Sequence, residues 1–305
     1  MADRDTPPET DLSDTNVFRL DRPRIRASFD RASERYESAA ILQSQVADEL
    51  LGRLQPFAFK PSVVLDLGAG TGRGSGALKR RYRSALVIAM DIAPGMLREA
   101  KRHMQLFRRF ERVCGDALQV PMRDASVDVV YSNLMLQWCE PLDRVLEEIR
   151  RVLKPDGFFA FSTFGPDTLR ELRTAWSAAD SYNHVNHFTD MHDIGDALVR
   201  AGLREPVLDV ERMQLTYPDT LALMRDLKTI GAHNVTAGRA RGLTGRRRIA
   251  KMQQAYESFR RDGVLPATYE IVYGASWGTS GQRVSSMNRG EAVVPIGAIT
   301  RRSRS

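Results

Sequence analysis

The stretch VVLDLGAGTG, Val63 to Gly72, decides the fold because it places three glycines at alternate positions directly after a short apolar run. The run at 63–67 has the length and character of a buried strand. Glycines at such spacing let the backbone turn tightly and let a ligand approach the main chain without meeting a Cβ. The stretch therefore predicts a strand that leads into a ligand-binding loop.

The spacing of the glycines excludes a phosphate-binding P-loop, which requires G-x-x-x-x-G-K-[ST]. It also disfavours a dinucleotide loop, which requires G-x-G-x-x-G, because Arg73 stands three residues after Gly70. What remains is D-x-G-x-G-x-G, which begins with Asp66. A nicotinamide enzyme stays the competing interpretation, since it also has an acid about 20 residues after its glycines.

The composition is that of an ordinary globular protein, with 305 residues of which 42% are hydrophobic and 27% charged. The first residues are polar and acidic, and no stretch approaches the length of a membrane span, so we expect a cytoplasmic protein without a membrane partner. Two cysteines, Cys114 and Cys139, are too few for a disulfide framework or a Cys-rich zinc site. The basic residues behind the net charge of +7 are nearly all arginine, a common surface residue in such chains, and we expect no nucleic acid partner.

Strand and helix patterns alternate through the middle of the chain. We predict strands at 63–67, 86–91, 110–114, 127–132 and 157–163, and helices at 72–83, 94–108 and 141–153. Pro155, Asp156 and Gly157 predict a turn before the last of these strands. Such alternation predicts an α/β fold with a mostly parallel sheet and helices on both faces.

The regions on either side of this core have different patterns. Residues 1–22 are polar and lack periodicity, which predicts disorder. Apolar residues at helical spacing predict one long helix, or two joined helices, over 25–54. The tail at 279–305 is rich in Gly, Ser and Arg and is expected to be mobile, although 291–299 could pair as an edge strand.

After residue 163 two longer strands, at 206–217 and 267–277, flank a helical stretch at 218–262. That stretch is too long for an ordinary crossover, so we interpret it as a cap inserted between the last two strands. Residues 165–188 are expected to form a second cap element.

In an open α/β sheet, ligands bind beyond the carboxyl ends of the strands. The helix after the glycine loop favours an anion, such as an aminoacyl carboxylate, at its N-terminus. Asp91 ends the second strand, where it can accept from both ribose hydroxyls, and Asp116 follows the third, where it can accept from the adenine amine. Asn133 and Leu134 end the fourth strand beside the loop. An amino acid, a ribose and an adenine in this order describe S-adenosylmethionine.

Three histidines, His184, His187 and His192, lie close together in NHVNHFTDMHD. Their spacing matches no helical pair of metal ligands, so we expect packing, capping or substrate contacts and no metal. Asp190 is expected to cap the helix that follows it. Cys139 is expected to be a packed apolar residue rather than a nucleophile.

The order and spacing of these residues resemble the class I methyltransferase fold over residues 60–165. The remaining motifs resemble the malonyl-acyl carrier protein O-methyltransferases of biotin biosynthesis over residues 24–278; they are SFDRASERYESAAILQ, SNLMLQWC, LRELRTAWSAAD, HVNHF, LMRDLKTIGA, GLTGR and PATYEIVYG. Ala69 and Thr71 depart from the Cys and Pro that often stand at these positions, with no expected effect on function. Enzymes that methylate adenine or amide nitrogen carry [DN]-P-P-[YF] where this chain has SNLM, so that class is disfavoured.

The resemblance implies a methyltransferase domain over 23–278, in which lid helices at 25–54 close over a cofactor core at 60–165. S-adenosylmethionine would be the co-substrate, and the free carboxylate of a malonyl thioester would be methylated to give the ester primer for biotin synthesis. Such a carboxylate is ionised at pH 7, so catalysis would rest on positioning rather than on a general base. Deletion of residues 1–22 is expected to be harmless, whereas deletion through residue 45 should abolish cofactor binding.

The strand ends and the resemblance together predict the residues of the site. The expected cofactor contacts are Tyr36, Gln43, Asp66, Gly68, Ala69, Gly70, Gly72, Asp91, Ile92, Met96, Asp116, Ala117, Asn133 and Leu134. The expected malonyl contacts are Tyr36, His184, Lys228 and Arg239, and an acidic carrier protein is expected to dock on Arg246, Arg247 and Arg248. Two alternatives stay open: another small-acid or quinone methyltransferase, and a non-methylating relative that hydroxylates or assists assembly of respiratory complexes.

Overall fold

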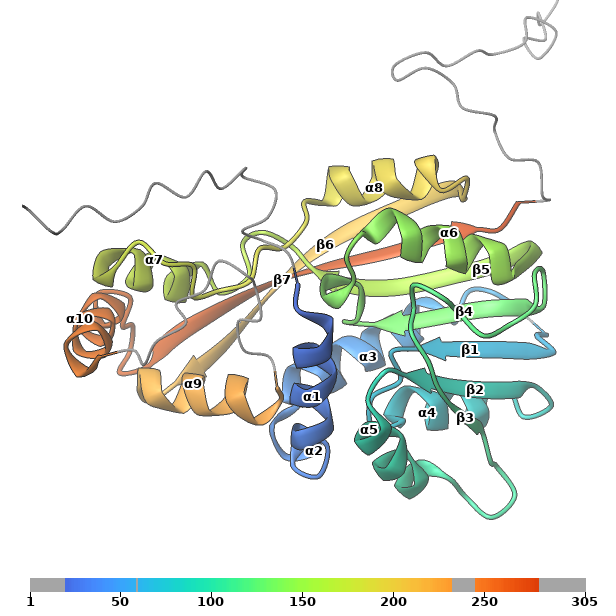
Figure 1. Cartoon of the computed structure of the whole chain (residues 1–305), viewed down its shortest axis with the longest axis horizontal. Helices are drawn as coiled ribbons and strands as arrows, with labels where there is room; N and C mark the ends of the chain where they lie inside the picture. The colour runs from blue at the N-terminus through green and yellow to red at the C-terminus, as the bar shows by residue number, and fades with distance from the viewer. Residues whose placement is uncertain (1–19, 59, 232–244, 280–305) are drawn as a thin grey trace, which may run out of the picture.

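The computed structural model of the chain describes residues 20–58, 60–231 and 245–279. Within these residues the centre is a seven-stranded sheet in the order β3-β2-β1-β4-β5-β7-β6 (Figure 1). The strands are β1 (Val63–Leu67), β2 (Leu86–Asp91), β3 (Glu111–Cys114), β4 (Val127–Asn133), β5 (Leu153–Phe164), β6 (Arg204–Tyr217) and β7 (Leu265–Trp277). The first five are parallel, and β7 runs antiparallel to both β5 and β6. The predicted α/β fold with a mostly parallel sheet is confirmed.

Helices cover both faces of the sheet. They are α1 (Arg22–Ala32), α2 (Tyr36–Ala39), α3 (Ile41–Arg53), α4 (Arg73–Arg81), α5 (Pro94–Glu99), α6 (Leu142–Val152), α7 (Arg170–Ala179), α8 (Met191–Arg200), α9 (Thr220–Thr229) and α10 (Arg246–Glu257), with short 3-10 helices η1 (Ala100–His103) and η2 (Leu136–Trp138). Successive residues of β1 point to opposite faces, so Val64 packs in one cluster with Leu78 of α4, while Leu65 packs in another with Ile149 of α6. A strand buried on both sides is what the apolar run at 63–67 predicts.

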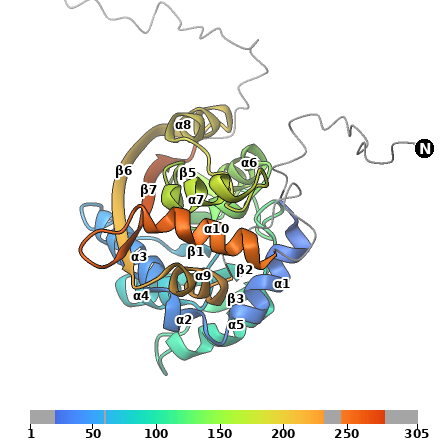
Figure 2. The ribbon, with the colours of Figure 1, turned by 90° about the vertical axis from the view of Figure 1, so that its left-hand side faces the viewer.

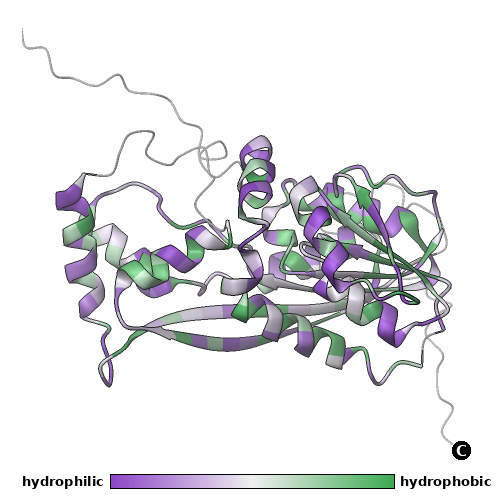
Figure 3. Cartoon of the chain, turned by 90° about the horizontal axis from the view of Figure 1, so that it is seen from below, coloured by the Kyte–Doolittle hydropathy of each residue, from purple (hydrophilic) through white to green (hydrophobic). Residues whose placement is uncertain are grey.

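The long strands β6 and β7 extend away from the core and carry α9 and α10 between them (Figure 1). Tyr217 at the end of β6 pairs with Leu265 at the start of β7, so the chain leaves and re-enters the sheet at one place. Helix α10 crosses in front of α7 and α9 when the cap is viewed end on (Figure 2). Along the edge strand β6 hydrophilic and hydrophobic residues alternate, as expected for a strand with one face toward solvent, whereas β7 between β5 and β6 is buried along most of its length (Figure 3 colours both strands by hydropathy).

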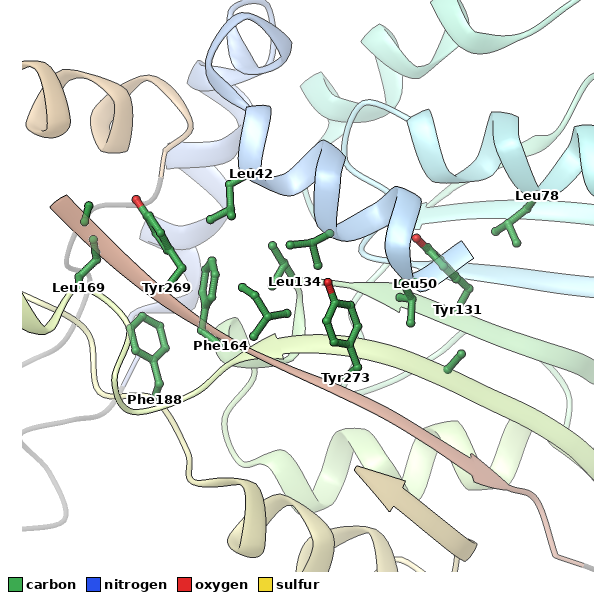
Figure 4. Close-up of a cluster of buried hydrophobic side chains, with 14 of the residues drawn as sticks. Leu42, Leu50, Leu78, Tyr131, Leu134, Phe164, Leu169, Phe188, Tyr269 and Tyr273 are labelled. Carbon is green, nitrogen blue, oxygen red and sulfur yellow. The ribbon is translucent and has the colours of Figure 1, made fainter. Parts of the chain in front are cut away.

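Aromatic side chains join the core to the cap. Phe164, the last residue of β5, lies with its ring centroid 5.5 Å from Phe188 and 5.8 Å from Tyr269 of β7 (Figure 4). All three are buried, and Leu169 packs in the same cluster. The position of the cap relative to the sheet is therefore fixed by packing close to the carboxyl end of β5.

The predicted helix over 94–108 is wrong in its length. The structure ends α5 at Glu99 and continues as η1 only to His103. Leu106 and Phe107, which lie within the predicted span, are 72% and 91% exposed. Since they bury no apolar face, nothing extends the helix through them.

Two further boundaries differ from prediction. The stretch 25–54 forms three helices rather than one or two, and α1 ends at Ala32, after which Ser33 Oγ donates to the carbonyl of Asp30 (2.9 Å). The predicted turn at 155–157 lies inside β5, where the pairing with β4 changes register between Val127 and Val129. Because β5 pairs with β4 on both sides of these residues, the turn is an irregularity within the strand rather than a break before it.

Several expectations fall outside the described residues. They concern disorder over 1–19, the tail over 280–305 with its possible strand at 291–299, and the malonyl contact Arg239. Among the described helices, none is long and apolar enough to cross a membrane.

Candidate active site

A cavity opens at the carboxyl ends of β1, β2 and β4 and contains about 1020 Å³ of empty space, counting its mouth. Its lining includes these predicted cofactor contacts: Tyr36, Gln43, Gly68, Gly70, Asp91, Ile92, Met96, Asp116, Ala117, Asn133 and Leu134. Asp66, Ala69 and Gly72 do not line it. We call this the first cavity. Its lining of apolar side chains with a few convergent polar groups is that of a small-molecule site.

The three glycines of the loop have different reasons to lack a side chain, although all three have positive φ. A Cβ on Gly68 would lie 2.3 Å from Met135 Cγ, and one on Gly72 would lie 2.7 Å from the Cβ of Ala100. A Cβ on Gly70 would meet no atom within 4 Å, and Gly70 lines the first cavity. Packing therefore requires glycine at 68 and 72, whereas Gly70 leaves open space where a ligand can approach the backbone.

Asp91 connects the end of β2 to the glycine loop. Its Oδ2 accepts from the amide of Gly70 (2.9 Å), and its Oδ1 accepts from the amide of Ala93 (2.8 Å). Burial raises the pKa of Asp91, and these backbone hydrogen bonds oppose the rise. The carboxylate faces the first cavity with capacity for further donors, as a ribose contact requires.

Asp116 also lies in the first cavity, but one of its oxygens already has a charged partner. Oδ1 accepts from the amide of Leu118 (2.9 Å), and Oδ2 forms an ion pair with Arg22 of α1. The amide of Leu20 donates to Glu140 Oε2 (2.7 Å), which ties the start of α1 across the same end of the sheet. Sequence reasoning missed Arg22, because it assigned residues 1–22 to a disordered segment.

Asp66 and Asn133 are both engaged with neighbouring elements of the fold. Asp66 is buried, and its Oδ2 accepts from Ser75 Oγ of α4 (2.5 Å). Burial, and secondarily the charge of Asp91, raise the pKa of Asp66 to about 7. Asn133 Nδ2 donates to the carbonyl of Gln43 (3.1 Å), and Asn133 Oδ1 accepts from Ser162 Oγ (2.8 Å), which connects α3 to β5.

Gln43 presents an unsatisfied polar atom. Its Oε1 is buried without a hydrogen-bond partner in the described part of the chain. Buried amide oxygens are normally paired, so one on a residue that lines a cavity indicates a ligand donor. Tyr36 lies in the same cavity, and burial, followed by the charge of Asp91, raises the pKa of its hydroxyl far above the ordinary value. Tyr36 therefore stays a neutral hydrogen-bonding group.

A second cavity lies between α1, α7 and α9, and it adjoins the first. Both cavities are lined by Gln43, Trp138, Phe164 and Ile230. The second includes the predicted malonyl contacts His184 and Lys228, whereas Tyr36 lines only the first. The two spaces therefore meet beside the side chain with the unsatisfied oxygen.

His184 is held firmly in the wall of the second cavity. Its ring stacks on Trp176 with centroids 3.7 Å apart, and its Nε2 lies 2.7 Å from Asp180 Oδ1. Burial opposes ionisation of Asp180, but the hydrogen bond with His184 prevails and lowers the pKa of the carboxyl. Arg248 Nη1 lies 3.7 Å from Asp180 Oδ2, so one member of the predicted docking cluster is connected to this wall.

The other histidines and Cys139 do not form a reactive centre. Asp190 accepts from the amide of His192 (2.8 Å) and caps α8, as predicted. Burial raises the pKa of the Cys139 thiol to about 12, so it stays protonated. Among the described residues, no three His, Cys, Asp or Glu side chains gather as a metal site would require.

Comparisons with known proteins agree with this arrangement. Residues 65–161 match the family model described as a methyltransferase domain. The malonyl-[acyl-carrier protein] O-methyltransferase of Methylovorus sp. (strain MP688) is 52% identical over 86% of this chain and 90% of its own length. That of Laribacter hongkongensis (strain HLHK9) is 49% identical over 92% and 97%.

Among solved structures, a putative methyltransferase from Bacillus halodurans superposes with a TM-score of 0.55 at 18% identity, covering 76% of this chain and all of that one. At that identity the likeness shows the fold alone. The relatives that are about half identical along nearly the whole chain show more, and the chain belongs to the malonyl-[acyl-carrier protein] O-methyltransferase family.

Proposed function

We propose that this chain transfers a methyl group from S-adenosylmethionine to the free carboxylate of a malonyl thioester carried by acyl carrier protein, as in biotin synthesis. The observation that carries the proposal is the junction of two cavities at Gln43, one with the features of a cofactor site and one enclosed by the cap. The names of the relatives indicate the same reaction. A methyl transfer needs two binding spaces that meet at one point.

Three features of the first cavity fit S-adenosylmethionine. Gly70 leaves space beside the backbone, Asp91 holds a carboxylate at the end of β2, and Gln43 offers an acceptor without a donor. When bound, S-adenosylmethionine supplies a methyl group on a positively charged sulfur. We propose that Asp91 accepts from ribose hydroxyls and that Gln43 Oε1 accepts from an amine.

The residues of the chain act by positioning. The malonyl carboxylate is ionised at pH 7, so it needs no general base, and orientation can contribute on the order of 7–11 kcal/mol to lowering the barrier. We propose that Gln43 Nε2 and His184 donate to this carboxylate. His184 has Nε2 bonded to Asp180, and in the doubly protonated imidazolium, where both ring nitrogens carry a proton, Nδ1 would donate to the malonyl carboxylate. Stacking on Trp176 fixes the plane of the ring and therefore the direction of that donor.

Transfer of a tritiated methyl group to malonyl-acyl carrier protein tests the proposal. We expect base-labile label in the carrier protein, as a methyl ester gives. Acetyl-acyl carrier protein is the matched control, because it lacks the free carboxylate and should stay unlabelled. Label that enters a quinone or a short free acid, with none in the malonyl carrier, would replace the proposal with one of its alternatives.

A further inference from the structure

The mouth of the second cavity carries a group of basic side chains, which we call the cationic rim. It consists of Arg31, Arg35, Arg225 and Lys228, all of them exposed and all lining the cavity. Arg31 lies on α1 and Arg35 on the turn after it, whereas Arg225 and Lys228 lie on α9. The buried part of the lining is largely apolar, and includes Leu169, Leu172, Trp176, Val185 and Phe188. The cavity is therefore cationic at its mouth and apolar inside.

The two halves of the rim are held together by packing between α1 and the end of α9. Ser28 Oγ of α1 donates to the carbonyl of Gly231, just after α9 (3.1 Å). A Cβ placed on Gly231 would lie only 3.3 Å from the Cβ of Ala32, so the two segments are in close contact. Bringing four like charges to neighbouring elements is unfavourable unless an anion joins them.

No such anion comes from the described protein. None of the four rim side chains has a hydrogen-bond or ion-pair partner among residues 20–58, 60–231 and 245–279. The nearby acids are engaged elsewhere: Asp30 accepts from the amide of Gly95 (2.5 Å), and Glu37 bonds His103 (2.5 Å). Asp226 interacts with Tyr217, and Glu34 lines neither cavity.

We propose that the cationic rim binds the phosphodiester at the base of the carrier's pantetheine arm, and that the apolar interior holds the arm itself. This inference rests on the proposed function. A pantetheine arm is long and thin, carries one anionic group at its far end, and ends in the acyl thioester. The second cavity offers the rim for the anionic group, apolar side chains for the arm, and Gln43, which it shares with the first cavity, for the acyl end. Lys228 is thereby assigned to the phosphodiester rather than to the malonyl group.

The test compares two small substrates that differ only in the phosphate, malonyl-phosphopantetheine and malonyl-pantetheine. For the native chain we expect the phosphate to lower KM roughly tenfold, as one charge-assisted contact can. The preference should shrink as salt is raised, because the rim is exposed. A native chain that methylates both substrates with equal KM would overturn the inference but leave the proposed function standing. Failure to methylate either small substrate would overturn the inference, and failure to methylate malonyl-acyl carrier protein as well would end the proposed function.

Paired variants locate the effect. Arg31→Gln with Arg225→Gln removes one charge from each half of the rim, and the ratio of the two KM values should fall close to one. Arg80→Gln with Arg83→Gln removes two exposed charges that line neither cavity, and should keep the native ratio. Melting temperatures confirm that both variants are folded. A rim variant that keeps the native ratio, or a control that loses it, would contradict the assignment.

Discussion

Asp91 combines two tasks in one carboxylate. It holds the glycine loop through the amide of Gly70, and it faces the first cavity. Asp91→Ala should weaken S-adenosylmethionine binding by about 10- to 150-fold, since charge-assisted hydrogen bonds contribute about 1.5–3 kcal/mol. Titration calorimetry measures the affinity, and circular dichroism checks the fold. An unchanged affinity would remove Asp91 from the site.

Asp66 should make stability depend on pH. Its folded pKa, about 7, lies above its ordinary value of 3.8, so its contribution is fully present below the ordinary value and is lost as pH rises through about 7. Asp66→Asn keeps an acceptor for Ser75 but cannot ionise. Its melting temperature should therefore fall less than that of the native chain between about pH 5 and pH 8.

Asp128 provides a control, because its effect on the pH dependence of stability has the opposite sign to that of Asp66. Burial opposes its ionisation, but the hydrogen bond from Lys154 prevails and lowers the pKa of its carboxyl. Its contribution is present above the ordinary pKa and is lost as pH falls. Asp128→Asn should accordingly be less stable than the native chain near neutral pH.

The prediction for Asp66 has its own contrary outcome. If the melting temperatures of the native chain and of Asp66→Asn change in parallel with pH, Asp66 does not titrate in this window.

The sequence predicted which residues line the first cavity where their place follows from their own strand end. Asp91 and Gly70 are examples, because a parallel sheet brings its carboxyl ends to one edge. It could not predict Arg22, whose significance depends on Asp116, a partner far along the chain. Nor could it show that Asp66 turns toward Ser75 rather than the first cavity, because the direction of a side chain depends on how the strand packs.

At the scale of elements, α1 is part of the site. Arg22 lines the first cavity and pairs with Asp116. We therefore expect residues 1–19, rather than 1–22, to be dispensable for cofactor binding. A chain that begins at residue 20 should bind S-adenosylmethionine like the full chain, whereas one that begins at residue 23 should bind it more weakly. Deletion through residue 45 should abolish binding, because it also removes Tyr36 and Gln43.

Calorimetry on the three truncated chains, each checked by thermal melting, measures this series. Equal affinity in the chains that begin at residues 20 and 23 would show that Arg22 does not contribute. Normal binding after deletion through residue 45 would refute the idea that the N-terminal helices cover the cofactor.

Elements with a buried apolar face were predictable, and those without one were not. The strand β1 and the helix α6 bury apolar residues in the core, and their predicted bounds differ from the observed ones by at most one residue. The helix predicted beyond α5 does not form, because Leu106 and Phe107 in its predicted span face solvent and bury no apolar surface. Periodicity reports which residues could share a face, but burial decides whether that face forms.

At the scale of the molecule, carrier recognition should involve two surfaces. We propose that Arg246 and Arg247, exposed on α10, attract the acidic body of the carrier, separately from the cationic rim. Arg246→Glu with Arg247→Glu should raise KM for malonyl-acyl carrier protein at low salt. KM for malonyl-phosphopantetheine should change little, because that substrate has no protein body. Arg248 is left in place, since it also contacts Asp180.

Steady-state kinetics at two ionic strengths measures this prediction. Rising salt should raise the KM of the native chain for malonyl-acyl carrier protein and change that of the reversed variant much less. Equal losses with both substrates would place the defect in the site or the fold. A native KM for the carrier at low salt would refute docking on α10.

The pairing of Tyr217 with Leu265 has a consequence for how such proteins diversify. Because the chain leaves the sheet after Tyr217 and returns to it at the paired residue Leu265, the segment that carries α9 and α10 can in principle be exchanged without breaking the pairing of β6 with β7. Recombination at this seam could replace one insert with another and leave the strands around the glycine loop in place. A hybrid joined at these two residues would exchange Arg225 and Lys228 but keep Gln43 and His184, so its acceptor preference would report which of the two parts selects the acceptor.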